Sequence, residues 1–177
     1  MSFSTYDASA PMFVNALTNM RNWLDKADSW AAAAKPEAEL LEARLVPDMH
    51  PLPRQYQMAS DAAKGAVARL AGLTPPSMAD TETSFAELRE RCDKTIAFIN
   101  SVDPAAIAAG ATRDVVLKFG NGMGYRFKGA DFLTGFAIPN FMFHATTAYA
   151  ILRAAGVPIG KADFLAHLGN PETNIED

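Results

Sequence analysis

The sequence has little of what marks several classes of protein. Cys92 is the only cysteine, so no internal disulfide can form, and this fits a reducing compartment. The 16 Lys and Arg residues are scattered along the chain without forming a cluster, and the formal net charge is -4. Binding to nucleic acid requires a basic footprint, because phosphate contacts dominate the affinity. We therefore expect no nucleic-acid partner.

Long apolar runs are also missing. No stretch approaches the roughly 20 apolar residues that are needed to span a bilayer. Residues 1–12 lack a basic segment followed by an apolar run, which is the form of a signal peptide. We therefore expect a cytoplasmic protein without a membrane partner. The 177 residues, 49% of them hydrophobic, suit one domain over 1–177 whose core needs no disulfide or metal.

What the sequence does have is helical periodicity. Apolar residues recur mostly at steps of three and four, which is typical of amphipathic helices. We expect the polar tail, 170–177, to be frayed. The pattern predicts long helices over about 10–34, 53–71 and 129–155, another that begins after Ser84, and shorter helical pieces over 37–45, 104–109 and 161–168.

Local signals mark the ends of these helices. Pro53 suits the first turn of a helix and Gly72 suits its exit. Ser84 and Glu87 have the spacing of a capping box, in which each side chain binds a free backbone N–H of the first turn. The stretch 72–83 between these two helices contains adjacent prolines and is typical of a loop.

The period changes to two late in the chain. Apolar residues alternate from Val115 to Phe119, and Asn121-Gly122 separates them from a second short segment of the same kind. An Asn-Gly pair between alternating segments predicts a β-hairpin. Together with four principal helices, this favours an all-α fold: a four-helix bundle with a small β-hairpin before the last long helix.

The last long helix contains a break and a histidine. Pro139 cannot donate to the carbonyl of Gly135, so we expect a kink there. One turn later His144 lies on the inner face of the helix, with Asn140 on nearly the same face. A buried imidazole needs a hydrogen-bond partner. His144 is therefore either a core histidine satisfied by a neighbour or part of a functional site.

A metal site formed by the three histidines, His50, His144 and His167, is the obvious alternative. Catalytic zinc usually has three protein ligands and one open position. The position four after His144 is Ala148, however, and no histidine pair has the spacing that places two ligands on one helical face. We expect no cofactor. If a divalent ion such as zinc or nickel is bound, His144 and His50 are its candidate ligands.

Two segments resemble the DUF1993 family, whose function is uncharacterised. One is Phe141–Arg153 with the following Gly156–Phe164, and the other is Leu45–Gln55 continuing to Ala63–Gly65. The resemblance extends over nearly the whole chain. The family is similar to a distant branch of the DinB/YfiT-like superfamily, which implies a four-helix bundle that forms a homodimer.

The superfamily also implies a site. Its well-studied members bind a divalent metal through one histidine of the second helix and an H-x-x-x-H pair of the fourth, and some transfer low-molecular-weight thiols. Here only His144 matches. The residues four before and four after it are Asn140 and Ala148, and the second-helix position is taken by Gln55 or Gln57. Two of the three ligands are missing, so the resemblance does not imply thiol transfer.

Two hypotheses remain, and the sequence does not decide whether the protein is an enzyme. The first is a non-catalytic or small-ligand-binding bundle, with His144, Asn140, Gln55 and Tyr149 as candidate pocket residues, or one that acts through dimer contacts. The second is a metal-dependent transferase or hydrolase that uses His144. The resemblance marks further recurrent residues without giving them roles: Asp48, Lys64, Arg153, Lys161 and Asp163.

Overall fold

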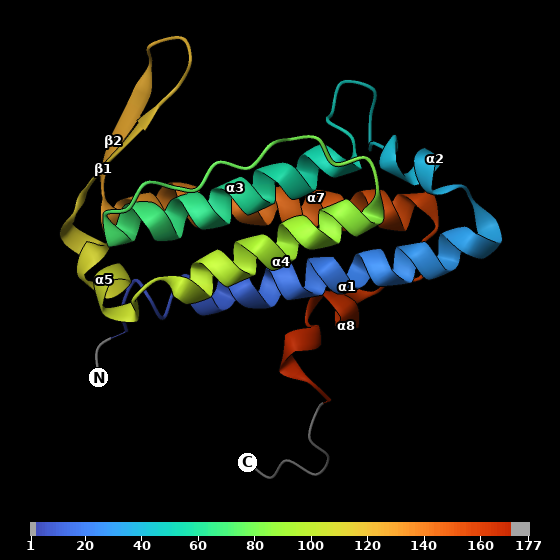
Figure 1. Ribbon diagram of the computed structural model, residues 1–177, viewed down its shortest axis with the longest axis horizontal. Coiled ribbons are helices and arrows are strands. Elements are labelled where there is room, and N and C mark those ends of the chain that lie inside the picture. Colours follow the sequence, from blue (N-terminus) through green and yellow to red (C-terminus); the bar gives the residue numbers. More distant parts are fainter. Residues whose placement is uncertain (1–2, 171–177) are drawn as a thin grey trace.

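Four long helices pack side by side in the computed structural model, which describes residues 3–170 (Figure 1). Helix α3 contacts both α4 and α7, and α1 contacts α4. This arrangement confirms the predicted bundle. The four helices are α1 (Ala10–Ala34), α3 (Leu52–Ala71), α4 (Phe85–Ser101) and α7 (Ile138–Ala155).

Shorter helical elements connect and extend the bundle. Their places agree with the sequence prediction, but the piece predicted over 37–45 already ends at Leu41. Of the tail predicted to fray, only Asn170, which is exposed, lies within the described residues. No helix in residues 3–170 is long and apolar enough to cross a membrane. The elements are α2 (Glu37–Leu41), α5 (Pro104–Ala108), α8 (Lys161–Phe164) and two 3₁₀ turns, Ala109–Thr112 and Ala166–Leu168.

The helix ends follow the signals in the sequence. Gly72 ends α3 with a φ of 76°, a left-handed conformation that glycine adopts without strain. At the start of α4, the hydroxyl of Ser84 accepts from the backbone N–H of Glu87 at 3.2 Å. The carboxylate of Glu87 accepts from the backbone N–H of Thr83 at 2.6 Å, so the reciprocal bond forms one residue earlier than in a standard capping box.

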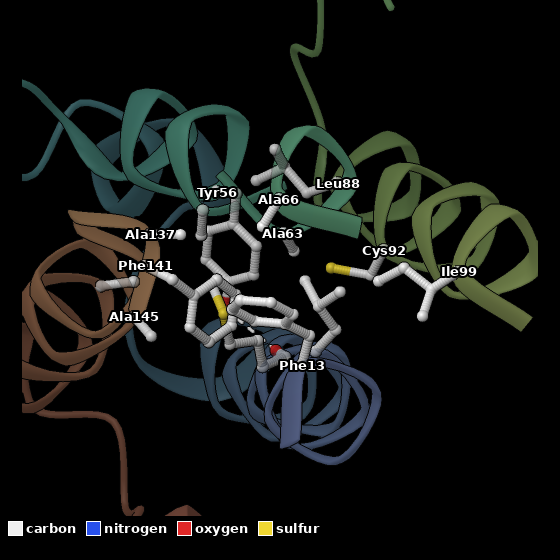
Figure 2. Close-up of a cluster of buried hydrophobic side chains, with 14 of the residues drawn as sticks. Phe13, Tyr56, Ala63, Ala66, Leu88, Cys92, Ile99, Ala137, Phe141 and Ala145 are labelled. Carbon is white, nitrogen blue, oxygen red and sulfur yellow. Dashed lines mark hydrogen bonds between the residues drawn. The ribbon is translucent and has the colours of Figure 1, made fainter. Parts of the chain in front are cut away.

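The core lies where the apolar faces of the four long helices meet (Figure 2). The rings of Phe13 and Phe141 pack edge-on with centroids 4.9 Å apart. The hydroxyl of Tyr56, a fully buried side chain, donates to the carbonyl of Met20 at 2.9 Å. Small side chains along α3 allow its neighbours to approach closely: Ala59, Ala63 and Ala66.

A β-hairpin projects from one end of the bundle (Figure 1). Strands β1 (Asp114–Lys118) and β2 (Gly124–Lys128) pair in antiparallel register, which confirms the prediction. The connecting loop runs from Phe119 to Met123, and Gly122 adopts a φ of 80° within it. Phe119 continues the alternating pattern of β1, but it lies in this loop and its side chain is 43% exposed.

The helix predicted over 129–155 is interrupted where the proline requires it. It consists of α6 (Gly129–Phe132), a π-helical segment (Leu133–Ala137) and α7. The π-helical segment ends two residues before Pro139, whose ring and missing N–H are incompatible with a regular bond to the carbonyl four residues earlier. A π-helical turn therefore lies where the sequence predicts a kink.

We predict that Cys92 is chemically silent in the folded protein. It is 2% exposed among apolar side chains (Figure 2), and burial raises the pKa of its thiol to about 12. The thiolate is the reactive form, so the native protein should not react with the thiol reagent DTNB at about pH 8.

A matched control is Ser101→Cys, which places a second thiol at an exposed position of the same helix. In that variant one thiol should react promptly and the other only after urea is added. Prompt reaction of both thiols would contradict the burial of Cys92.

Candidate functional site

His144 and Gln55 meet between α7 and α3. The imidazole Nδ1 lies 2.9 Å from the side-chain Oε1 of Gln55. Both side chains are buried, with 9% of His144 and 2% of Gln55 exposed. Gln55, rather than Gln57, is therefore the second-helix residue that faces the histidine, because the amide of Gln57 donates to Glu82 at 2.9 Å.

A backbone carbonyl sets the tautomer of His144. The side-chain Nε2 of Gln55 donates to the carbonyl of His50 at 3.0 Å, and a reversed amide would place two oxygens against each other. The Oε1 of Gln55 is therefore the atom that faces the imidazole, and it can only accept. It follows that Nδ1 of His144 carries the proton and that Nε2 keeps its lone pair.

The surroundings also keep this imidazole neutral. Burial, and then electrostatic repulsion from His50 and Arg54, lower the pKa of His144 below its usual value. Its Nε2 has no protein hydrogen-bond partner in residues 3–170. It keeps some contact with solvent, because Nε of Arg91 is the one fully enclosed side-chain nitrogen or oxygen without a hydrogen-bond partner in that part of the chain. His144 thus offers an accessible acceptor, or base, at neutral pH.

His144 lines a pocket of about 320 Å³ between α3, α7 and the hairpin. Asn140 lines the same pocket, so the structure brings these two predicted residues together. Tyr149 is not among the lining residues. Its ring packs instead against Trp23 and Phe164, with centroid distances of 5.5 and 5.6 Å.

Aromatic rings form the apolar wall of the pocket. Phe132 and Phe136 stack with centroids 6.1 Å apart, and Phe119 of the hairpin loop lines the pocket with them. Phe119 also packs edge-on against Tyr125 of β2 at 5.7 Å. The hairpin therefore serves as one side of the pocket, which alternation of apolar residues alone could not indicate.

Several further pocket residues, among them two charged residues of α3, were missed by sequence reasoning. Asp61 and Arg69 of α3 both line the pocket, as do Met58 and Ala62 of the same helix. Positions 55, 58, 62 and 69 lie on one helical face, since they follow steps of three, four and seven. The face that carries Gln55 could therefore have been extended to Arg69 from the sequence.

The three histidines are not gathered at one place. The imidazole of His50 is exposed, and its backbone carbonyl is the group that contacts Gln55. Nδ1 of His167 lies 3.1 Å from the amide of Asn19 on α1. Within residues 3–170 no group of three or more His, Cys, Asp or Glu side chains is placed to hold a metal ion.

Comparison with known proteins agrees with this architecture. The sequence profile described as a domain of unknown function, DUF1993, matches residues 5–165. The chain belongs to the DUF1993 family. It is also similar to the crystal structure of a DinB family member protein from Shewanella denitrificans, with 36% identity, a TM-score of 0.84, and coverage of 97% of this chain and 95% of that one. No curated protein matches it.

These matches confirm the predicted family and the DinB-like bundle with its small hairpin.

The structure gives contacts for some of the recurrent residues that the DUF1993 resemblance marks. Arg153 donates to the carbonyl of Val157 at 3.4 Å. Asp163 accepts from the backbone N–H of Gly160 at 2.7 Å and pairs with Lys26. Two others, Asp48 and Lys161, are exposed.

A second polar cluster of this DUF1993 protein surrounds Arg91 of α4. Arg91 is 3% exposed, and its guanidinium binds Asp61 at 2.9 Å, Asp80 at 3.0 Å and Glu82 at 2.7 Å. Asp80 and Glu82 belong to the loop 72–83, which runs along the outside of α3 (Figure 1). Arg91 therefore attaches this loop to the bundle and also binds a residue that lines the His144 pocket.

We predict that Arg91→Leu destabilises the protein by on the order of 3 kcal/mol, since it leaves the largely buried Glu82 without a cation and removes the bonds that hold the loop 72–83. Urea unfolding measures this loss. The matched control is Lys94→Leu on the same helix, which removes a pair with Glu90 in which both side chains are 61% exposed. An exposed pair contributes under about 1 kcal/mol. Equal losses in the two variants would contradict the role of Arg91.

We also predict that His144 titrates below its usual pKa and that Gln55→Glu raises this pKa above it. A carboxylate next to Nδ1–H would stabilise the imidazolium. Proton NMR of the three imidazoles measures both titrations, and His144→Gln assigns the signal.

His167 provides an internal control, because its signal should not move in Gln55→Glu.

In the wild type the unfolded chain binds the His144 proton more tightly than the folded protein does. The free energy of unfolding should therefore fall as the pH drops below the usual histidine pKa. A His144 signal that titrates at or above that value would contradict the neutral tautomer.

Proposed function

We propose that this DUF1993 protein binds a small organic ligand in the pocket beside His144, without a metal ion. The observation that carries the proposal is the unpartnered Nε2 of a neutral imidazole, whose orientation is set by Gln55, at the edge of an aromatic pocket. A group held in one tautomer by a buried amide is arranged for recognition more than for packing.

The size and lining of the pocket support this proposal. Small-molecule sites are concave, largely apolar, and contain a few polar groups that fix the orientation of the ligand. A volume of about 320 Å³ accommodates a ligand of up to three aromatic rings. Phe132 and Phe136 would contact the body of the ligand, and an O–H or N–H of the ligand would donate to Nε2 of His144.

A metal-dependent transferase or hydrolase finds less support in the same residues. Nε2 of His144 could bind zinc or nickel, and its bond from Nδ1 to Oε1 of Gln55 is compatible with that, but no group of three or more His, Cys, Asp or Glu side chains in residues 3–170 is placed to hold the ion. The imidazole of His50, the other candidate ligand, is exposed. The donors around Nε2 therefore do not fit a divalent ion as they are placed. The homodimer and the cytoplasmic location stay predictions.

The test uses N-phenylnaphthylamine, a neutral apolar probe that fluoresces when bound and carries one N–H donor. We expect saturable binding to the wild type. Ala62→Phe fills the pocket from α3 and should weaken the binding by at least about tenfold. The matched control is Ala86→Phe, at an exposed position of α4, which should leave the affinity unchanged.

Thermal unfolding of both variants establishes that they are folded before the affinities are compared. Absence of saturable binding, or equal binding by Ala62→Phe and the wild type, would overturn the proposed pocket. Elemental analysis of protein purified without a histidine tag addresses the metal. One equivalent of zinc or nickel that is lost in His144→Gln would overturn the metal-free part of the proposal.

A further inference from the structure

Arg69 is a cation of the pocket that lacks a counterion. It lies on α3, on the face that carries Gln55, and its side chain is half-buried and lines the pocket with His144. Its Nη1 donates to the backbone carbonyl of Gly65 at 2.9 Å. No carboxylate in residues 3–170 pairs with it, whereas the buried Arg91 on the neighbouring helix binds three.

A glycine makes room for this guanidinium. A Cβ at Gly65 would lie 2.5 Å from Nη1 of Arg69, which is closer than real Cβ contacts. The guanidinium therefore lies against the helix one turn before its own residue, and not in open solvent. Burial lowers the pKa of Arg69, yet a guanidinium stays charged at every physiological pH. A partly desolvated charge without a partner is unfavourable, so this position favours an anion nearby.

The other charges at the pocket increase this preference. Asp61 is the one carboxylate among the lining residues, and its Oδ1 already pairs with Lys64 and Arg91. Lys118 of β1 also lines the pocket and adds a second positive charge from the hairpin side. The pocket is thus locally positive, although the whole chain has a net charge of -4.

We propose that the ligand of this pocket is an organic carboxylate with a flat apolar body. With Nη1 engaged by Gly65, Nε and Nη2 of Arg69 remain as a fork that matches the two oxygens of a carboxylate. The rings of Phe132 and Phe136 face the body of the ligand, and Nε2 of His144 accepts its hydrogen-bond donor. This inference rests on the proposed function and adds the chemical class of the ligand to it.

The test compares two competitors of the same shape that differ in charge. Naphthoate and naphthamide are titrated against bound N-phenylnaphthylamine, the neutral probe. In the wild type, naphthoate should displace the probe at a concentration at least about tenfold lower than naphthamide. Arg69→Met should remove this difference by weakening naphthoate alone, and Arg69→Lys should restore only part of it, because lysine lacks the fork.

Controls separate the local charge from the charge of the whole molecule. Arg44→Met removes an exposed cation that does not line the pocket, and it should leave the preference for naphthoate intact. Unchanged affinity for the neutral probe shows that the Arg69→Met variant is folded and that its pocket is open.

The outcomes distinguish the two proposals. If the neutral probe does not bind the wild type, the proposed function fails. If the probe binds but naphthoate and naphthamide displace it equally, the pocket stands and the anionic ligand is refuted. Naphthyl phosphate is the third competitor. If it displaces the probe tightly and naphthoate does not displace it, the proposal that the ligand is a carboxylate is overturned, and the ligand is an anion of another class.

Discussion

The burial of the Arg91 guanidinium is the constraint on which most of the polar structure depends. A charge with almost no solvent access must be neutralised inside the protein, and three carboxylates converge on it from α3 and from the loop 72–83. Two of them attach a loop that has no secondary structure of its own to the outside of the bundle. The third carboxylate, Asp61, lies at the edge of the pocket and is already paired with Arg91, so Arg69 remains there without a counterion.

Helix α3 connects the Arg91 cluster to the candidate site, because it contributes side chains to both. Asp61 and Lys64 are part of the Arg91 cluster, while Arg69 lines the pocket and Gln55 contacts His144, which lines it too. Between these two sides runs the row of alanines that lets α4 and α7 approach closely. Close packing gives the side chains of α3 little freedom, so the amide of Gln55 is held against a backbone carbonyl and determines which nitrogen of His144 is available.

The sequence predicts those parts that depend on local chemistry. The period of apolar residues gives the four long helices, Gly72 gives the end of α3, and the inward His144 follows from its place on a helical face. The facing Gln55 comes from the family resemblance. The rest depends on contacts between distant segments. Asp80 and Glu82 lie in a loop without periodicity, so nothing local shows that they bind Arg91. Tyr149 looks like a pocket residue near His144, but it packs with Trp23 and Phe164 on another side.

The hairpin makes the two sides of the pocket unequal in stiffness. The polar groups His144 and Arg69 of the pocket lie on long packed helices. The opposing wall includes Phe119, in the loop of a two-stranded sheet that projects from the bundle. A two-stranded sheet is only marginally stable by itself. Val115 and Leu117 anchor β1 in the core, but Phe119 lies in the loop beyond them. In the proposed binding mode, the polar end of the ligand would therefore meet groups on packed helices, and its apolar body would meet a less constrained loop. Substitutions in that loop would then change the ligand shapes that fit without disturbing the core.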